Sequence, residues 1–333
     1  MKHLSVSQLY LILCFITWTI LGSYTRLAIT KLSDYGQAFI QPSTVLWSNC
    51  VASLTMGLIQ GLNEYGIFSQ TMFVSLTTGY SGTVSSFSSF IMEMFLHSTN
   101  LTEIALKGGK FPNRAYGIME FLSVLIIHLF VSMTSLLFGM RVAREFDAVL
   151  GIKDKETQPC NERVRKFIYG LQVINISLSI PLVVVQVVLA SVYDNYSREW
   201  TLSAIFGIVG SLLRYLLARL YNSKNKNFPW GTFLANFVAT LMFAVLVIVQ
   251  RGKKNSKSMI VTSANTSRIL VALTNGFCGG LSTISTFIYE GYKLPFRHMM
   301  KYYTITIASC YIICVVVLGS YAWTRGLGVA LYT

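Results

Sequence analysis

A stretch rich in glycine and serine occurs twice in this chain, each time inside an apolar segment. It covers residues 276–290 and, 197 positions earlier, residues 79–93. Small residues in a membrane helix usually serve close helix packing. A repeat that keeps its Phe and Glu in register instead favours a broken helix, which is tolerated at membrane depth only where protein or a cavity covers the freed backbone. The identical pairs are Gly79 and Gly276, Gly82 and Gly279, Ser85 and Ser282, Ser88 and Ser285, Phe90 and Phe287, Ile91 and Ile288, and Glu93 and Glu290.

The composition is that of an integral membrane protein. Of the 333 residues, 53% are hydrophobic and 12% are charged, and the mean hydropathy is +0.55. The net charge of +14 resides in short loops between apolar segments, which argues against a nucleic-acid partner. The six cysteines show no metal-ligand spacing, and no nucleophile recurs with a base, so an enzyme is not expected.

Apolar runs of about 20 residues, the length that spans a bilayer, predict an all-α membrane protein with nine transmembrane helices. Two short motifs recur in the first four runs and in the last four, which are therefore two copies of one unit. The runs fall at about residues 8–30, 42–62, 70–96, 115–140, 167–192, 200–221, 229–250, 266–291 and 299–323. The recurring motifs are Gly22 with Arg26 and Gly210 with Arg214, then Pro42 with Asn49 and Pro229 with Asn236.

These copies define the domain organisation. We expect a first four-helix repeat at residues 1–140, a polar loop and linker helix at 141–195, and a second repeat at 196–333. One helix between two four-helix units turns the second unit upside down. The layout is then 4+1+4, with inverted repeats and a site near the membrane midplane. The linker helix is polar enough to form a path, but a connector packed on the outside is favoured.

The loops indicate how this multi-pass protein is oriented. Loops on the side of the N-terminus hold 13 basic residues against 10 on the other side, which favours an N-terminus in the cytoplasm. The three glycosylation sequons that lie in loops begin at Asn100, Asn195 and Asn265, and all three fall on the opposite side.

With these motifs the chain resembles the Fluc/FEX fluoride channels, also called CrcB proteins. The motifs that carry the resemblance are Gly210 to Tyr215, the Pro-Trp-Gly-Thr segment before Asn236, and residues 276–287, each with a counterpart in the first half. The fused 4+1+4 layout is similar to the eukaryotic FEX form. The resemblance implies passive, fluoride-selective export across the plasma membrane by a chain that works as a monomer.

A fluoride pore must replace the water around the ion with hydrogen-bond donors. Asn236 and Asn49 each offer two amide N–H groups, although a buried Asn also serves as a link between helices. Ring edges of phenylalanine carry the positive end of the ring quadrupole. The resemblance assigns Phe87 and Phe287 to the pore, and the polar residues Thr232, Tyr302, Thr306 and Cys310 recur at helical spacing around it. The predicted fluoride pore therefore comprises Asn236, Phe87, Phe287, Thr232, Tyr302, Thr306 and Cys310.

The symmetry-related pore is predicted to be degenerate. Ile284 stands where the family has Phe, and Glu120 would place a carboxylate where an anion should pass. The predicted degenerate pore comprises Asn49, Phe90, Ile284, Tyr116 and Glu120.

The remaining polar residues are assigned as follows. Arg26 and Arg214 have a structural role inside the membrane or snorkel to its surface. The resemblance also implies a structural sodium ion, held by backbone carbonyls of Gly82, Ser85, Gly279 and Ser282. We expect Glu93 and Glu290 to pair with loop cations, and His128 to be a packing residue.

The alternative function is a coupled transporter of small cations or drugs, which is also built from inverted four-helix repeats. It would require a midplane carboxylate in each half. Glu120 is the only candidate, and its counterpart in the sequence alignment is Thr306.

Overall fold

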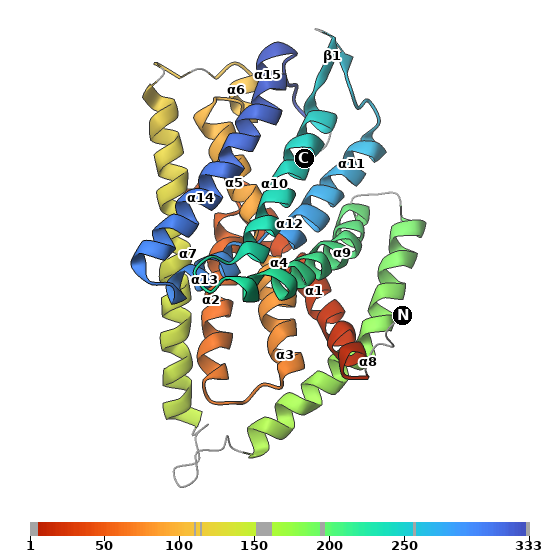
Figure 1. The fold of residues 1–333 in the computed structure, drawn as a ribbon. Helices are drawn as coiled ribbons and strands as arrows, with labels where there is room; N and C mark the ends of the chain where they lie inside the picture. The colour runs from red at the N-terminus through yellow and green to blue at the C-terminus, as the bar shows by residue number, and fades with distance from the viewer. Residues whose placement is uncertain are drawn as a thin grey trace.

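A computed structural model describes residues 6–109, 111–113, 115–150, 162–193, 197–255 and 258–330, so residues 151–161 of the polar loop predicted at 141–166 and the sequon at Asn195 lie outside the described residues. The described chain is almost entirely helical (Figure 1). Its α-helices are α1 Val6–Leu32, α2 Leu46–Asn63, α3 Gln70–Val74, α4 Gly82–Val84, α5 Phe87–Ser98, α6 Glu103–Leu106, α7 Ala115–Leu150, α8 Glu162–Val192, α9 Ser197–Tyr221, α10 Trp230–Arg251, α11 Ala264–Leu273, α12 Gly279–Leu281, α13 Ile284–Lys293, α14 Phe296–Cys314 and α15 Ser320–Thr324.

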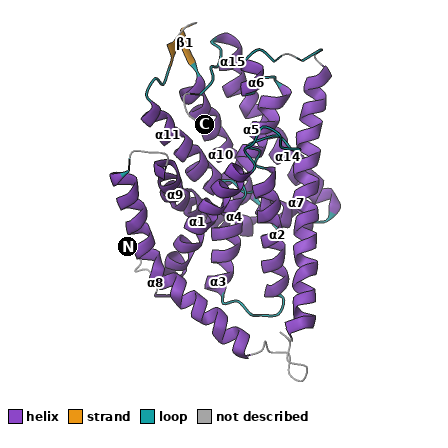
Figure 2. Ribbon diagram, turned by 180° about the vertical axis from the view of Figure 1, so that it is seen from behind, coloured by secondary structure: helices purple, strands orange, loops and turns teal. Residues whose placement is uncertain are grey.

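The other elements are short. Wider π-helical turns interrupt three of the apolar helices, and one hairpin joins β1 to β2 (Figure 2). The π-helical turns are Ser75–Ser81, Thr274–Cys278 and Val315–Gly319, the 3-10 turn is Asn222–Lys224, and the strands are β1 Lys253–Asn255 and β2 Ser258–Met259.

Seven helices in the described parts of the chain are long and apolar enough to cross a membrane, which confirms a multi-pass, all-α membrane protein. Two of the nine predicted spans are not among the seven. The span predicted at 42–62 shortens to α2, an 18-residue helix that carries Ser, Asn, Thr and Gln side chains. The span predicted at 70–96 is interrupted between α4 and α5. The seven are Val6–Leu32, Ala115–Phe146, Glu162–Val192, Arg198–Lys224, Trp230–Arg251, Ala264–Lys293 and Phe296–Thr324.

Corresponding helices of the two halves run in opposite directions. In Figure 1, α2 descends to a loop at the bottom and α3 rises from it, whereas α10 rises to the hairpin at the top and α11 descends. The long helices α7 and α8 lie at opposite edges of the molecule in Figures 1 and 2.

The linker helix α8 packs against α1 through its polar side chains. Thr17 Oγ1 donates to the Asn175 carbonyl at 2.7 Å, and Tyr24 Oη donates to Gln186 Oε1 at 2.6 Å. Asn175, Gln186 and Ser179 are the buried polar residues of α8. The polarity that the sequence shows in this segment therefore serves helix contact.

Both repeated stretches contain a break in the helix, as the sequence predicts. Ser85 and Ser86 have extended backbone between α4 and α5, and Ser282 and Thr283 have extended backbone between α12 and α13. The side chain of Ser86 caps α5 and that of Thr283 caps α13, each by accepting a backbone N–H three residues on. A hydroxyl residue directly before Phe87 and directly before Ile284 therefore lets α5 and α13 begin after the breaks.

Two arginines connect the broken helices. Arg214 of α9 donates from Nη1 to the Gly82 carbonyl and from Nη2 to the Thr78 carbonyl, both at 2.6 Å. Arg26 of α1 donates from Nη1 to the Thr83 carbonyl at 2.9 Å. Both side chains are buried, at 4% exposure for Arg26 and 2% for Arg214, which favours a structural role over snorkelling.

The repeated glycines provide space for these arginines. A Cβ atom on Gly279 would overlap the guanidinium of Arg26, and one on Gly82 would overlap the guanidinium of Arg214. The arginine of each half thus lies against the glycine of the other half. This contact fixes where the two broken helices cross.

Serine and threonine side chains complete the crossing. Ser85 Oγ lies 3.1 Å from both Thr283 Oγ1 and Ser285 Oγ, and Ser282 Oγ lies 2.9 Å from Ser88 Oγ. The polar side chains of each break therefore bond to the other break, so the buried hydroxyls have partners.

We predict that Arg214→Lys destabilises the protein by about 2–4 kcal/mol, because lysine cannot reproduce the fork of donors and a buried charge loses its partners. The measurement is the unfolding midpoint of purified protein in detergent. Arg219→Lys, on the exposed side of the same helix, is the matched control and should change little. Equal stability of the two variants would contradict a stabilising role for the hydrogen bonds of Arg214.

Candidate functional site

In each half of the chain, an asparagine binds the backbone of the helix break. Asn236 Oδ1 accepts the Thr283 N–H at 2.8 Å, and its Nδ2 donates to the Thr283 carbonyl at 3.3 Å. Asn49 makes the same pair of bonds with Ser86, at 2.8 and 3.4 Å. Both asparagines are fully buried. Each therefore has a structural role in addition to the predicted role of donor to an anion.

The two asparagines differ in their remaining amide hydrogen. Nδ2 of Asn49 lies 3.4 Å from His128 Nδ1. For Asn236, the carbonyl of Thr283 is the one acceptor found for Nδ2 within the described residues. Asn236 thus keeps one donor for a ligand, whereas Asn49 does not.

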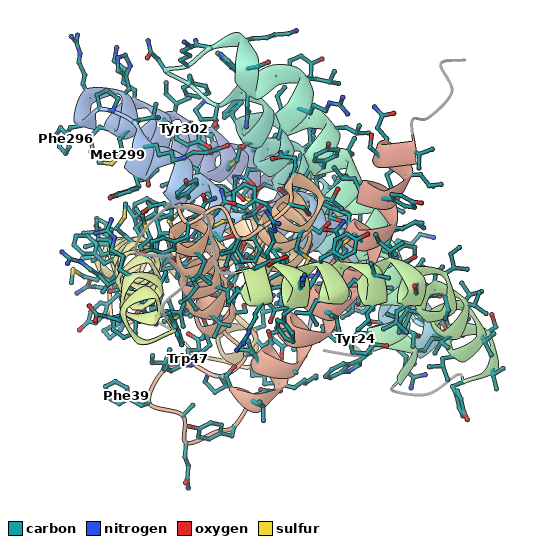
Figure 3. All side chains as sticks on the ribbon, turned by 90° about the horizontal axis from the view of Figure 1, so that it is seen from below. Tyr24, Phe39, Trp47, Phe296, Met299 and Tyr302 are labelled. Carbon is teal, nitrogen blue, oxygen red and sulfur yellow. The ribbon has the colours of Figure 1, made fainter. Side chains whose placement is uncertain are left out.

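We call the residues of the predicted fluoride pore, Asn236, Thr232, Phe87, Phe287, Tyr302, Thr306 and Cys310, the second-half track. The rings of Phe87 and Phe287, from opposite halves, are 5.0 Å apart and meet edge to face at 64°. The Tyr302 ring lies 4.9 Å from that of Phe287. Figure 3 places Phe296 at the outer edge of the molecule and Tyr302 further in, where α14 meets α10. The structure therefore brings together the predicted aromatic residues.

Polar side chains extend this track in both directions from Tyr302. Tyr302 Oη donates to Glu290 Oε2 at 2.9 Å, and Thr232 Oγ1 donates to Glu290 Oε1 at 2.8 Å. Thr306 and Cys310 follow one and two turns after Tyr302 on the same face of α14, and both are fully buried. Thr306 Oγ1 has no hydrogen-bond partner within the described part of the chain.

The prediction that Glu290 pairs with a loop cation is wrong. Its carboxylate accepts hydrogen bonds from Tyr302, Thr232 and Asn222 Nδ2, the last at 2.9 Å. Glu93 is also bonded inside the protein, because it accepts from the Val45 N–H at 2.6 Å and from Thr44 Oγ1 at 2.9 Å. Glu93 and Glu290 occupy matching positions of the repeated stretch, which indicates that they have equivalent roles in the two halves.

The structure does not place Tyr116 and Glu120 beside Asn49 and Phe90, so their assignment to the degenerate pore is corrected. Tyr116 is 46% exposed and stacks on Phe111. Glu120 Oε2 lies 3.3 Å from His97 Nδ1. The transporter alternative also loses support, because Glu120 lies at the surface and pairs with a histidine.

His128 occupies the place that Tyr302 has in the other half. Its ring lies 4.9 Å from that of Phe90, and its Nε2 lies 3.2 Å from Glu93 Oε2. The prediction that it only packs is therefore wrong. Ser132 and Leu136 follow one and two turns later and are buried, as Thr306 and Cys310 are.

Tyr116 does not correspond to Tyr302 because the connection before the fourth helix differs in length between the two halves. Sixteen residues, 99–114, separate α5 from α7, whereas two residues, 294–295, separate α13 from α14. The loop and the first turns of α7 have no counterpart in the second half. The match of Tyr116 to Tyr302 is therefore displaced along α7 by 12 residues, the difference between Tyr116 and His128.

Ile284 and Phe90 are both fully buried and belong to the same apolar cluster as Phe87 and Phe287. The first half thus has its own track, formed by Asn49, Phe90, His128, Glu93 and Ser132, which we call the first-half track.

Two carbonyl groups of the predicted sodium site lie close together, because Arg214 Nη1 lies 2.6 Å from the Gly82 oxygen and 3.5 Å from the Ser282 oxygen.

The chain is similar in sequence to proteins of known name. Fluoride export protein 1 of Saccharomyces cerevisiae is 46% identical over 98% of this chain and 96% of its own length. Fluoride export protein 1 of Candida albicans is 37% identical over 98% of this chain and 84% of its own length. The fluoride-specific ion channel FluC of Geobacter sulfurreducens is 35% identical over 27% of this chain and 67% of its own length. No solved structure matches the chain.

A family model described as CrcB-like protein, Camphor Resistance (CrcB), matches residues 201–327, which include α10 and both segments of the second broken helix. The full-length similarity to the fungal proteins extends this match to the first half. The chain belongs to the family of the fluoride export proteins.

Proposed function

We propose that this protein is a passive, fluoride-selective export channel and that the anion moves along the second-half track. The observation that carries the proposal is the second amide hydrogen of Asn236, which is left over there, whereas that of Asn49 lies against His128. The hydroxyl of Thr306 is a further buried donor without a partner in the described chain, as is that of Ser132 in the first half. The positive ring edges of Phe87 and Phe287 add to them. A small anion that loses its water needs such donors.

Glu290 limits which groups can donate. In this arrangement Tyr302 and Thr232 direct their hydroxyl hydrogens at Glu290, so neither is free to donate to an anion. The three hydrogen bonds to Glu290 spread its charge, which reduces repulsion of an anion nearby. The carboxylate thus orients the two hydroxyls at one end of the track.

The proposed arrangement is nine spans in a 4+1+4 layout of inverted repeats. The opposite directions of α2–α3 and α10–α11 support it (Figure 1), as does the position of α8 at the edge. Because both broken helices come from one chain, we propose a functional monomer in the plasma membrane, with its N-terminus in the cytoplasm. A negative interior then drives an anion outward by about 2.3 kcal/mol per charge per 100 mV.

We also propose that the first-half track does not conduct. Ile284 removes one of its two aromatic rings. The second-half track keeps both, so the channel has one working path.

We predict that Phe87→Ile and Phe287→Ile each lower fluoride efflux from proteoliposomes by at least about 10-fold, the effect of losing roughly 1.4 kcal/mol of stabilisation. Phe90→Ile is the matched control and should leave efflux within about 2-fold of the unchanged protein. A fluoride electrode measures efflux after potassium permeability is added. Equal losses in all three variants would contradict a single working path, and absence of efflux from the unchanged protein would contradict the channel itself.

A structural sodium ion at the crossing is a separate proposal. Converging carbonyl oxygens of Gly82 and Ser282 are the donor type that a hard cation prefers, and each carbonyl has a second lone pair beside the bond from Arg214. Ser85 and Gly279 would supply the other two carbonyls. The guanidinium groups of Arg26 and Arg214 oppose the cation by charge repulsion, so the carbonyl oxygens must outweigh two positive charges.

If sodium binds there, exchanging it for N-methyl-D-glucamine should lower the unfolding temperature in detergent, and adding sodium back should restore it. Binding to the folded state stabilises by about 2.7 kcal/mol at 100 times the dissociation constant. Potassium at equal ionic strength is the control. The same unfolding temperature in all three salts would rule out the site.

A further inference from the structure

The first-half track contains a continuous chain of hydrogen bonds that the second-half track lacks. It runs from the helix break through Asn49 and His128 to Glu93, with steps of 3.4 Å from Asn49 Nδ2 to His128 Nδ1 and 3.2 Å from His128 Nε2 to Glu93 Oε2. The three side chains come from α2, α7 and α5. His128 is 3% exposed, so the middle of the chain is enclosed by protein, while the Glu93 side chain at its outer end is 24% exposed.

The partners of the imidazole define its tautomer. Glu93 is an acceptor, so His128 Nε2 carries the hydrogen and donates to it. His128 Nδ1 then carries a lone pair and accepts from Asn49 Nδ2. The imidazole therefore has no N–H left for an anion.

The side-chain oxygen and both side-chain amide hydrogens of Asn49 are used in this arrangement. Its oxygen accepts the Ser86 N–H, one hydrogen goes to the Ser86 carbonyl, and the other goes to His128. In the other half, Tyr302 bonds to Glu290 and makes no bond to Asn236 among the described contacts. The exchange of Tyr for His thus removes the one free amide donor of the track.

We propose that the Asn49–His128–Glu93 chain closes the first-half track to fluoride. It uses up the amide hydrogens of Asn49 and the N–H of His128, which would otherwise replace part of the hydration shell of the anion, and it leaves Ser132 Oγ as the one track donor without a partner in the described chain. Ile284 adds to the closure by removing a ring edge. This inference rests on the proposed function and names the residues that make the two tracks unequal.

The closure should be reversible by giving the first-half track the residues of the second. The starting variant carries Phe87→Ile, which shuts the second-half track. Adding His128→Tyr and Ile284→Phe should raise fluoride efflux at least about 10-fold above the Phe87→Ile variant. Efflux that stays at the level of Phe87→Ile would overturn the proposal, provided that the same two changes in the unchanged chain leave its efflux intact.

The reciprocal change decides the case in which the double change impairs folding. Tyr302→His should place an imidazole between Asn236 and Glu290 and lower efflux at least about 10-fold. Tyr302→Phe, which offers Asn236 no acceptor, should retain more efflux than Tyr302→His. Equal efflux from these two variants, both monodisperse in detergent, would overturn the proposal. Failure of the proposed function is distinguished from these outcomes, because the unchanged protein would then release no fluoride.

Discussion

The structure depends on how the carbonyl groups freed by two helix breaks at membrane depth are satisfied. No bulk water reaches such groups in a bilayer, so the protein must supply donors. Arg26 and Arg214 bond to carbonyls just before the first break, and Asn49 and Asn236 bond to the second extended residue of each break. These donors explain why glycine recurs at the crossing, since a Cβ atom there would displace a guanidinium.

The same donors connect structure to function. Asn236 holds the break and still has one amide hydrogen directed elsewhere, so a structural residue can also serve an anion. Asn49 holds its break equally well but gives its other hydrogen to His128. Duplicated halves can therefore share a scaffold and differ in transport, because the scaffold needs only part of each asparagine.

The sequence predicted the crossing well, because the constraint there is local and repeated. Gly82 and Gly279, with the hydroxyl residues that follow, mark the breaks in the sequence, and the breaks fall there. It predicted the fourth helix of the first half poorly. The 16-residue connection after α5 hides the register of α7, so Tyr116 was matched to Tyr302 although His128 takes that place. The bonds of Glu290 depend on side chains from three distant segments, which spacing alone does not reveal.

The central claim is that one chain contains a complete fluoride path. The direct measurement is the fraction of fluoride retained by liposomes reconstituted at protein densities so low that many vesicles receive no chain. If one chain is sufficient, the fraction of vesicles that lose their fluoride rises with protein density in the same way as the probability that a vesicle holds at least one chain. A rise that follows the probability of holding two chains would contradict it.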